Sequence, residues 1–78
     1  AAERAQVQAE IAATEQSRAV AQLDVTRSRQ LFDEGLAARR DFELAQIKVA
    51  DATAKLAESR AKLNRIDVQL RRQSAQLV

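Results

Sequence analysis

The sequence contains one glycine, Gly35, and no proline, so only this residue interrupts two long stretches with helical patterning. Glycine readily adopts the left-handed conformation that closes a helix, and without proline neither stretch carries a built-in kink. We therefore expect one helix near residues 2–34, a turn near 35–38 and a second helix near 39–77. The predicted fold class is all-α, an antiparallel two-helix coiled-coil hairpin.

The side-chain composition predicts an extended hairpin rather than a globular core. Hydrophobic residues make up 46% of the 78 residues, but alanine supplies 17 of them, so large apolar side chains are scarce. The polar residues are mostly good helix formers. We expect residues 1–78 to form a single hairpin and to be a fragment of a larger protein.

The second half carries an unbroken heptad pattern, with apolar or small residues spaced alternately three and four apart. Acidic residues stand four positions before basic residues in three places, an order that adds about 0.3 kcal/mol per pair in helices. These pairs are Asp51 with Lys55, Glu58 with Lys62, and Asp67 with Arg71. The heptad positions are Phe42, Ala45, Val49, Ala52, Leu56, Ser59, Leu63, Ile66, Leu70, Gln73 and Leu77.

The first half offers two candidate seams, rotated from each other by roughly 100° around the helix. The sequence does not rank them firmly, but an antiparallel fold places Phe32 opposite Phe42, which favours the first. That choice leaves Leu23, Arg27 and Leu31 on its flank. The first seam is Val7, Ile11, Thr14, Arg18, Ala21, Val25, Ser28 and Phe32; the second is Ala9, Ala13, Gln16, Val20, Leu23, Arg27 and Leu31.

The residue content argues against several classes of function. There is no histidine or cysteine and no metal-ligand cluster in the sequence, so we assign no catalytic, cofactor-binding or metal-binding residue and predict that the protein is not an enzyme. The 13 basic and 11 acidic residues alternate instead of forming a basic stripe with interleaved aromatics, so nucleic acid is not expected as a partner. No apolar run approaches the roughly 20 residues that cross a bilayer.

The residues around the turn resemble those of a known family. Arg27 is followed four residues later by Leu31 and seven residues after that by Ala38, and the flanking sequence reads Leu-Phe-Asp-Glu-Gly-Leu and Arg-Arg-Asp-Phe-Glu-Leu-Ala. This pattern resembles the tip of the α-helical hairpin in bacterial periplasmic adaptor proteins, or membrane fusion proteins, of the HlyD type. That family has arginine, leucine and serine at this spacing, so Ala38 departs from it.

The resemblance implies that the hairpin belongs to a tripartite efflux or type I secretion system. In this family the hairpin is inserted in a lipoyl domain and docks by its tip to a TolC-like outer-membrane channel. Flanking domains link it to an inner-membrane transporter, and neighbouring adaptor copies form a homo-oligomer, a hexamer in the full assembly. The parent protein would lie in the periplasm, anchored at the inner membrane.

By this analogy the channel-contact tip comprises several residues on either side of the turn residue Gly35. We expect Arg27 to hydrogen-bond the channel, since its planar fork offers five donors, and Leu31 to pack into a channel groove. Outward-facing residues of the second helix could contact a neighbouring hairpin. The tip residues are Arg27, Leu31, Ala38, Arg39 and Arg40, and the lateral candidates are Leu44 and Ile47.

Ala38 also lacks the side-chain oxygen that usually caps a helix start, which costs about 1 kcal/mol. Asp41 in the first turn can still favour the helix through its dipole.

A second class of function fits the heptads equally well. A structural or recognition coiled-coil arm of an unrelated protein, such as an RNA-gripping arm or a self-assembling rod, needs the same hairpin. An RNA-gripping arm would show basic residues along one exposed face, whereas acidic residues interrupt most basic neighbours here. A rod would need no matched tip.

Overall fold

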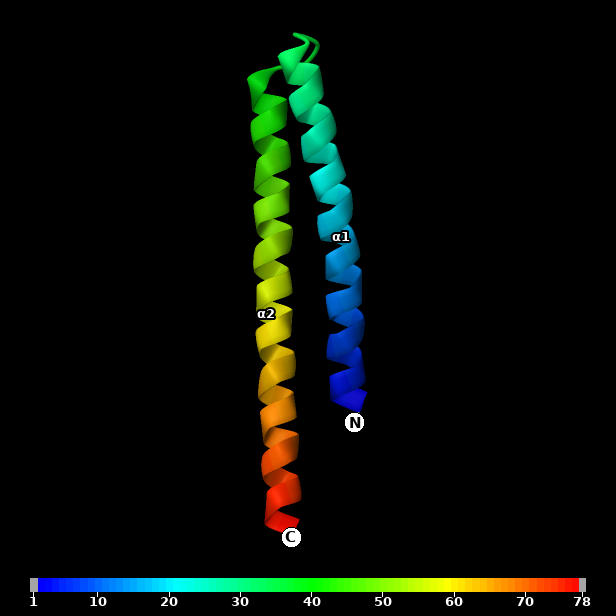
Figure 1. Cartoon of the computed structure of the whole chain (residues 1–78), viewed down its shortest axis with the longest axis vertical. Helices are drawn as coiled ribbons and strands as arrows, with labels where there is room; N and C mark the ends of the chain where they lie inside the picture. Colours follow the sequence, from blue (N-terminus) through cyan, green and yellow to red (C-terminus); the bar gives the residue numbers. More distant parts are fainter. Residues whose placement is uncertain (1, 78) are drawn as a thin grey trace.

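The computed structural model describes residues 2–77 and has two helices, α1 (Ala2–Asp33) and α2 (Arg39–Leu77). They run antiparallel and pack against each other from the connection at one end to the start of α1, and the last turns of α2 continue past that point (Figure 1). The molecule measures 65 Å along its long axis and 14 and 12 Å across. The fold class predicted from the sequence, an all-α hairpin, is confirmed, and the observed helix bounds lie within one residue of those expected.

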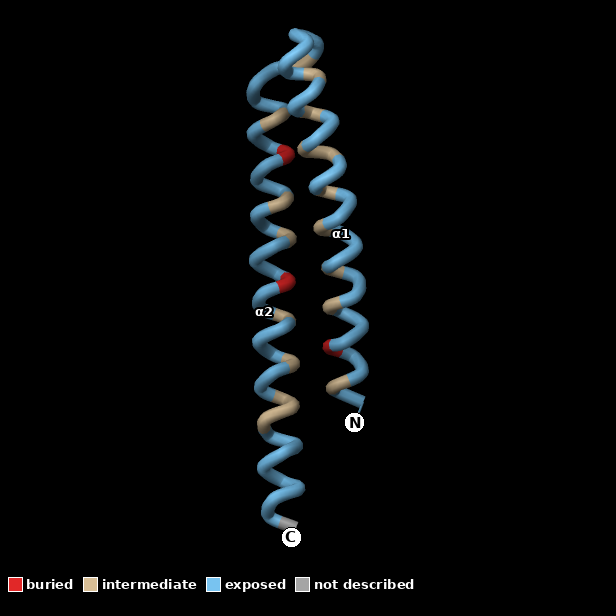
Figure 2. Tube along the Cα trace, viewed as in Figure 1, coloured by how far each residue is buried: buried red, intermediate tan, exposed pale blue. Residues whose placement is uncertain are grey.

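The first of the two candidate seams of α1 faces α2. Val7 is 1% exposed, and Ile11, Thr14, Arg18 and Ala21 are half-buried on the same stripe. On the rejected seam every residue before Leu31 is exposed. Figure 2 shows the buried and half-buried positions following one line along each helix.

The heptad pattern of α2 also matches its burial along most of its length. Ala45 and Leu56 are 3% and 2% exposed, and the intervening heptad residues Val49 and Ala52 are half-buried. The small residues at alternate heptad positions leave little apolar volume between the helices. The core is therefore a narrow line of contacts, not a deep interior.

Contacts between the helices set their register. The rings of Phe32 and Phe42 stack with centroids 6.2 Å apart and an interplanar angle of 29°, the pairing expected from the sequence. Farther from the turn, Arg60 Nη2 lies 3.2 Å from Glu15 Oε1. Arg18 precedes Phe32 by as many residues as Leu56 follows Phe42, so the same register places Arg18 level with Leu56.

The ion pairs between residues 2 and 77 differ from those expected in α2. None of the three predicted pairs within α2 lies within 4.0 Å; instead Asp67 Oδ1 accepts a hydrogen bond from Arg4 Nε across the helices at 2.7 Å. That hydrogen bond and the attraction of the carboxylate raise the pKa of the Arg4 guanidinium above its ordinary value. The expectation for Asp67 and Arg71 was wrong because a cross-helix partner comes within reach.

The turn closes α1 with a Schellman motif around Gly35. The Gly35 amide donates to the Phe32 carbonyl at 3.0 Å, and the Leu36 amide donates to the Leu31 carbonyl at 2.8 Å. Gly35 has φ +75°, the left-handed conformation that the sequence predicted for it. These bonds satisfy carbonyls that the helix end would otherwise leave free.

Candidate functional site

The family-like residues of α1 lie in its last two turns. Arg27 and Leu31 are four residues apart and so occupy one side of the helix. Arg27 is exposed and has no ion pair or side-chain hydrogen bond among the described residues. Its five donors are therefore available to another molecule.

Leu31 differs from its expected place on the flank of the core. It is half-buried, while Phe32, expected in the core, is 36% exposed. The inward stripe of α1 therefore passes between these two residues in the final turn. Leu31 is thus partly buried and partly accessible to solvent.

The basic residues at the start of α2 are not equivalent. Arg39 Nε bonds Glu43 Oε1 at 3.1 Å, although the arginine side chain remains 79% exposed. Arg40 is exposed, and no described residue pairs with it. Arg40 is thus the arginine of this pair whose donors are free of intramolecular contacts.

Ala38 is exposed at the junction between the turn and α2. Its carbonyl accepts a hydrogen bond from the Asp41 amide at 3.0 Å, which forms the first link of the helix. Its methyl group offers no acceptor for the other free amides of the first turn. Ala38 therefore accepts the backbone hydrogen bond that begins the helix, but it supplies no side-chain hydrogen bond to cap it.

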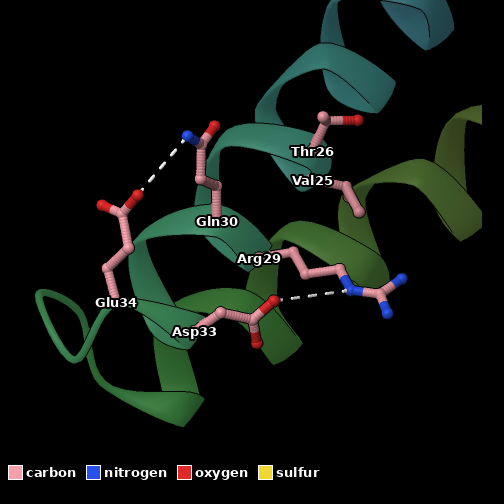
Figure 3. A pocket seen from close by; sticks show the side chains of 6 residues that line it. All are labelled: Val25, Thr26, Arg29, Gln30, Asp33 and Glu34. Atoms are coloured by element: carbon pink, nitrogen blue, oxygen red, sulfur yellow. Dashed lines mark hydrogen bonds and ion pairs between the residues drawn. The ribbon is translucent and has the colours of Figure 1, made fainter.

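A shallow surface depression lies along one side of α1 next to the turn (Figure 3). Its polar side chains bond one another: Arg29 Nε lies 4.0 Å from Asp33 Oδ2, and Gln30 Nε2 donates to Glu34 Oε1 at 3.5 Å. Because the depression is open and its groups are paired along the helix, it has the character of solvated surface. Val25 and Thr26 line its other end.

Leu36, which lies in the predicted turn near residues 35–38, is the most exposed large hydrophobic residue among the described side chains. The residue is 72% exposed at the apex of the turn. The sequence did carry a signal for it, because a glycine that closes a helix is commonly followed by an apolar residue that packs back on the last turn. Here that residue remains mostly in solvent.

The two lateral candidates on α2 are exposed, as their outward heptad positions predict. Leu44 is 45% and Ile47 55% exposed, and α1 adds Val20 and Leu23 at 61% and 68%. Of the seven exposed large hydrophobic residues that the structure describes, six lie between residues 20 and 47, in the part of the hairpin nearer the turn. The seventh is Leu70.

The exposed side chains near the turn are of kinds that can bind another molecule. Between residues 2 and 77 there is no group of three or more acidic, histidine or cysteine side chains placed to hold a metal ion. Neither described helix combines the length and apolarity needed to cross a membrane. The arginines and apolar side chains near the turn can form hydrogen bonds and bury apolar area against a partner.

Comparisons of this chain with protein-family models, curated proteins and solved structures return no match.

Proposed function

We propose that this chain is the hairpin of a periplasmic adaptor in a tripartite efflux or type I secretion system, and that its tip docks to a TolC-like outer-membrane channel. The observation that carries the proposal is the position of Arg27 and Leu31, which share one side of α1 next to the turn of a 65 Å hairpin. The resemblance of the tip sequence to that family supplies the identity of the partner.

The dimensions of the hairpin suit a spacer between distant partners. A narrow pair of helices has its binding groups at the far end, while the opposite end holds both termini (Figure 1). Flanking domains at that end would connect the hairpin to the inner-membrane transporter. The parent protein would then be periplasmic and anchored at the inner membrane.

Arg27 and Leu31 would contribute different interactions to the docked tip. The free guanidinium of Arg27 can donate to carboxylate or carbonyl oxygens of the channel, which gives the contact direction as well as affinity. The accessible part of Leu31 can bury apolar area beside it. Arg40, whose donors are also free, would add a second basic contact across the turn.

The alanine at position 38 limits the polar contribution of the turn. A serine there could cap α2 and also reach a partner, whereas the Ala38 methyl group can do neither. Docking would thus depend more on Arg27 and on apolar contacts. Neighbouring copies would assemble as a homo-oligomer, with Leu44 and Ile47 as the lateral contact residues.

Capture of a purified TolC-like channel by the immobilised hairpin tests the proposal. The variants Arg27→Asp and Leu31→Ser are measured separately, because Leu31 is half-buried and its replacement could weaken folding. The matched control is Arg65→Asp, which makes the same charge change at an exposed arginine far from the turn. Circular dichroism at 222 nm verifies that each variant keeps its helices.

Channel capture by the wild type that is lost in folded Arg27→Asp and retained in Arg65→Asp supports docking by the tip. Equal loss in both arginine variants would mean that general charge attraction, not the tip, holds the channel. Absence of capture by the folded wild type in its oligomeric form would refute the proposal. A spacer or a coiled-coil arm of an unrelated protein would then be the better interpretation.

A further inference from the structure

We propose that the hairpin associates side by side with a second copy of itself. The outer stripe of α1 in one copy packs against the outer stripe of α2 in the next, and Val20 then lies opposite Ile47. The adjacent layer pairs Leu23 with Leu44. This inference goes beyond the proposed function, because the pattern of the chain itself identifies the partner and no channel is needed.

The outer stripe of α1 is its second heptad seam, which α2 leaves uncovered. Alternate spacings of four and three residues are the pattern by which one helix packs on another in a coiled coil. The exposed members of this stripe are Ala9, Ala13, Gln16, Val20 and Leu23. A shallow depression on it is lined by Ala13, Gln16, Ser17 and Val20, which have the spacing of the four residues that form a hole for a partner's side chain.

The outer side of α2 carries a matching stripe. Leu44 and Ile47 are 45% and 55% exposed and stand three residues apart. Val20 and Leu23 on α1 are 61% and 68% exposed and have the same spacing. Both stripes thus place two large apolar side chains nearer the turn and alanines farther from it. The stripe of α2 consists of Leu44, Ile47, Asp51, Ala54, Glu58 and Ala61, all exposed.

The spacing of the stripes sets how two copies meet. When both turns point the same way, α1 of one copy runs antiparallel to α2 of the next, so residue numbers fall along one helix as they rise along the other. With Val20 opposite Ile47, a step of three residues reaches the second apolar pair. That pair is Leu23 with Leu44, and farther from the turn the same register brings alanines together.

A level arrangement of the copies does not pair these side chains. In the register of the hairpin itself, Leu23 would lie opposite Asp51 of the neighbour. Leu44 would likewise lie opposite Gln30. The apolar pairing therefore shifts the neighbouring copy by one heptad along the axis, about 10.5 Å. Because two different surfaces meet, each copy can bind one neighbour through α1 and another through α2.

The charges that border the two stripes favour α2, not a second α1, as the partner. At seven-residue steps the border of α1 carries Glu3, Glu10 and Asp24, and that of α2 carries Asp41, Lys48, Lys55 and Lys62. Glu10 falls beside Lys55 of the neighbour, and neither has an ion pair among residues 2–77 of the hairpin. Near the turn two arginines and two aspartates without ion pairs there meet in equal number, namely Asp24 and Arg27 of one copy with Arg40 and Asp41 of the next.

The contact is small, so the association is weak and reversible. Two helices that touch over about 20 Å bury less than the roughly 1,200 Å² of a stable interface. Alanines on the other border leave room for the helices to approach closely. They are Ala12 and Ala19 on α1, and Ala50 and Ala57 on α2.

Disulfide trapping tests which surfaces meet, because the chain contains no cysteine. Hairpins with the single substitutions Val20→Cys and Ile47→Cys are mixed in a glutathione redox buffer, and mass spectrometry identifies the linked pairs. Each molecule carries one thiol, so every disulfide joins two copies and requires Cβ atoms about 4 Å apart. Val20→Cys mixed with Ala54→Cys reports the level arrangement, and Val20→Cys alone reports contact between two α1 helices.

We expect the link between positions 20 and 47 to exceed both its statistical share and the links in the two controls. In sedimentation equilibrium, Ile47→Lys should weaken self-association at least about tenfold, whereas Gln46→Lys, beside the stripe, should not. Tm at low concentration should be the same in both variants, because both positions are exposed.

A dominant link between positions 20 and 54 would overturn the shifted register, and one between two copies of position 20 would overturn the choice of α2 as partner. Links in statistical proportions would overturn the contact itself. These measurements contain no channel, so this inference and the proposed docking can fail independently.

Discussion

Replacement of Arg18 by leucine should stabilise the hairpin, although it removes a charged side chain from a helix rich in charges. Arg18 lies on the inward stripe of α1, level with the buried Leu56 in the register of the two phenylalanines. Its Nε atom is buried and has no hydrogen-bond partner. A leucine at this position would remove that donor and continue the apolar seam.

The expected gain follows from two contributions. A buried donor without a partner costs about 1–3 kcal/mol. A leucine adds about 1 kcal/mol of apolar burial at a half-buried site, although the arginine stem already covers some of the same surface. We therefore expect the free energy of unfolding to rise by about 2 kcal/mol, or about 10 °C in Tm for a chain of this size.

Thermal unfolding followed by circular dichroism at 222 nm measures this gain. Two protein concentrations, about tenfold apart, separate intramolecular stability from association, since only association makes Tm depend on concentration. Arg65→Leu is the control, because Arg65 is exposed and its replacement should change stability by less than about 0.5 kcal/mol. A Tm of Arg18→Leu equal to or below that of the wild type would refute the reasoning.

Three further substitutions test the turn, the start of α2 and the ion pair near the termini. Gly35→Ala should lower the free energy of unfolding by about 1–2 kcal/mol in a urea titration, purely from backbone strain, because no atom lies within 4 Å of the added methyl group; an unchanged midpoint would contradict this. Ala38→Ser should raise the free energy of unfolding by about 1 kcal/mol, because the serine oxygen would cap α2. A lower midpoint in the same urea titration would show that the cap does not form. Asp67→Asn should lower Tm slightly at low salt by removing the partner of Arg4, and the difference from the wild type should shrink as sodium chloride is added. A difference that persists in high salt would point to packing instead of charge.

The sequence was most informative where a feature depends on near neighbours in the chain. The position of the turn followed from Gly35, and the facing pair Phe32 and Phe42 followed from counting outward from that turn. The exposure of Leu44 and Ile47 followed from their outward heptad positions. The candidate tip residues were named from a sequence resemblance, and their function is a proposal that the binding experiments above test.

The sequence by itself determined that this chain forms two helices joined at Gly35, because helix periodicity, the absence of proline and the conformational freedom of glycine are properties of local segments. Only the tertiary structure decided which stripe of α1 faces α2, that Leu31 is half-buried, that Asp67 pairs with Arg4 and that Leu36 extends into solvent. These features depend on where the axis of one helix lies against the other. Two stripes that are rotated by about 100° can look alike along one helix, and only contact with the second helix makes one of them the core.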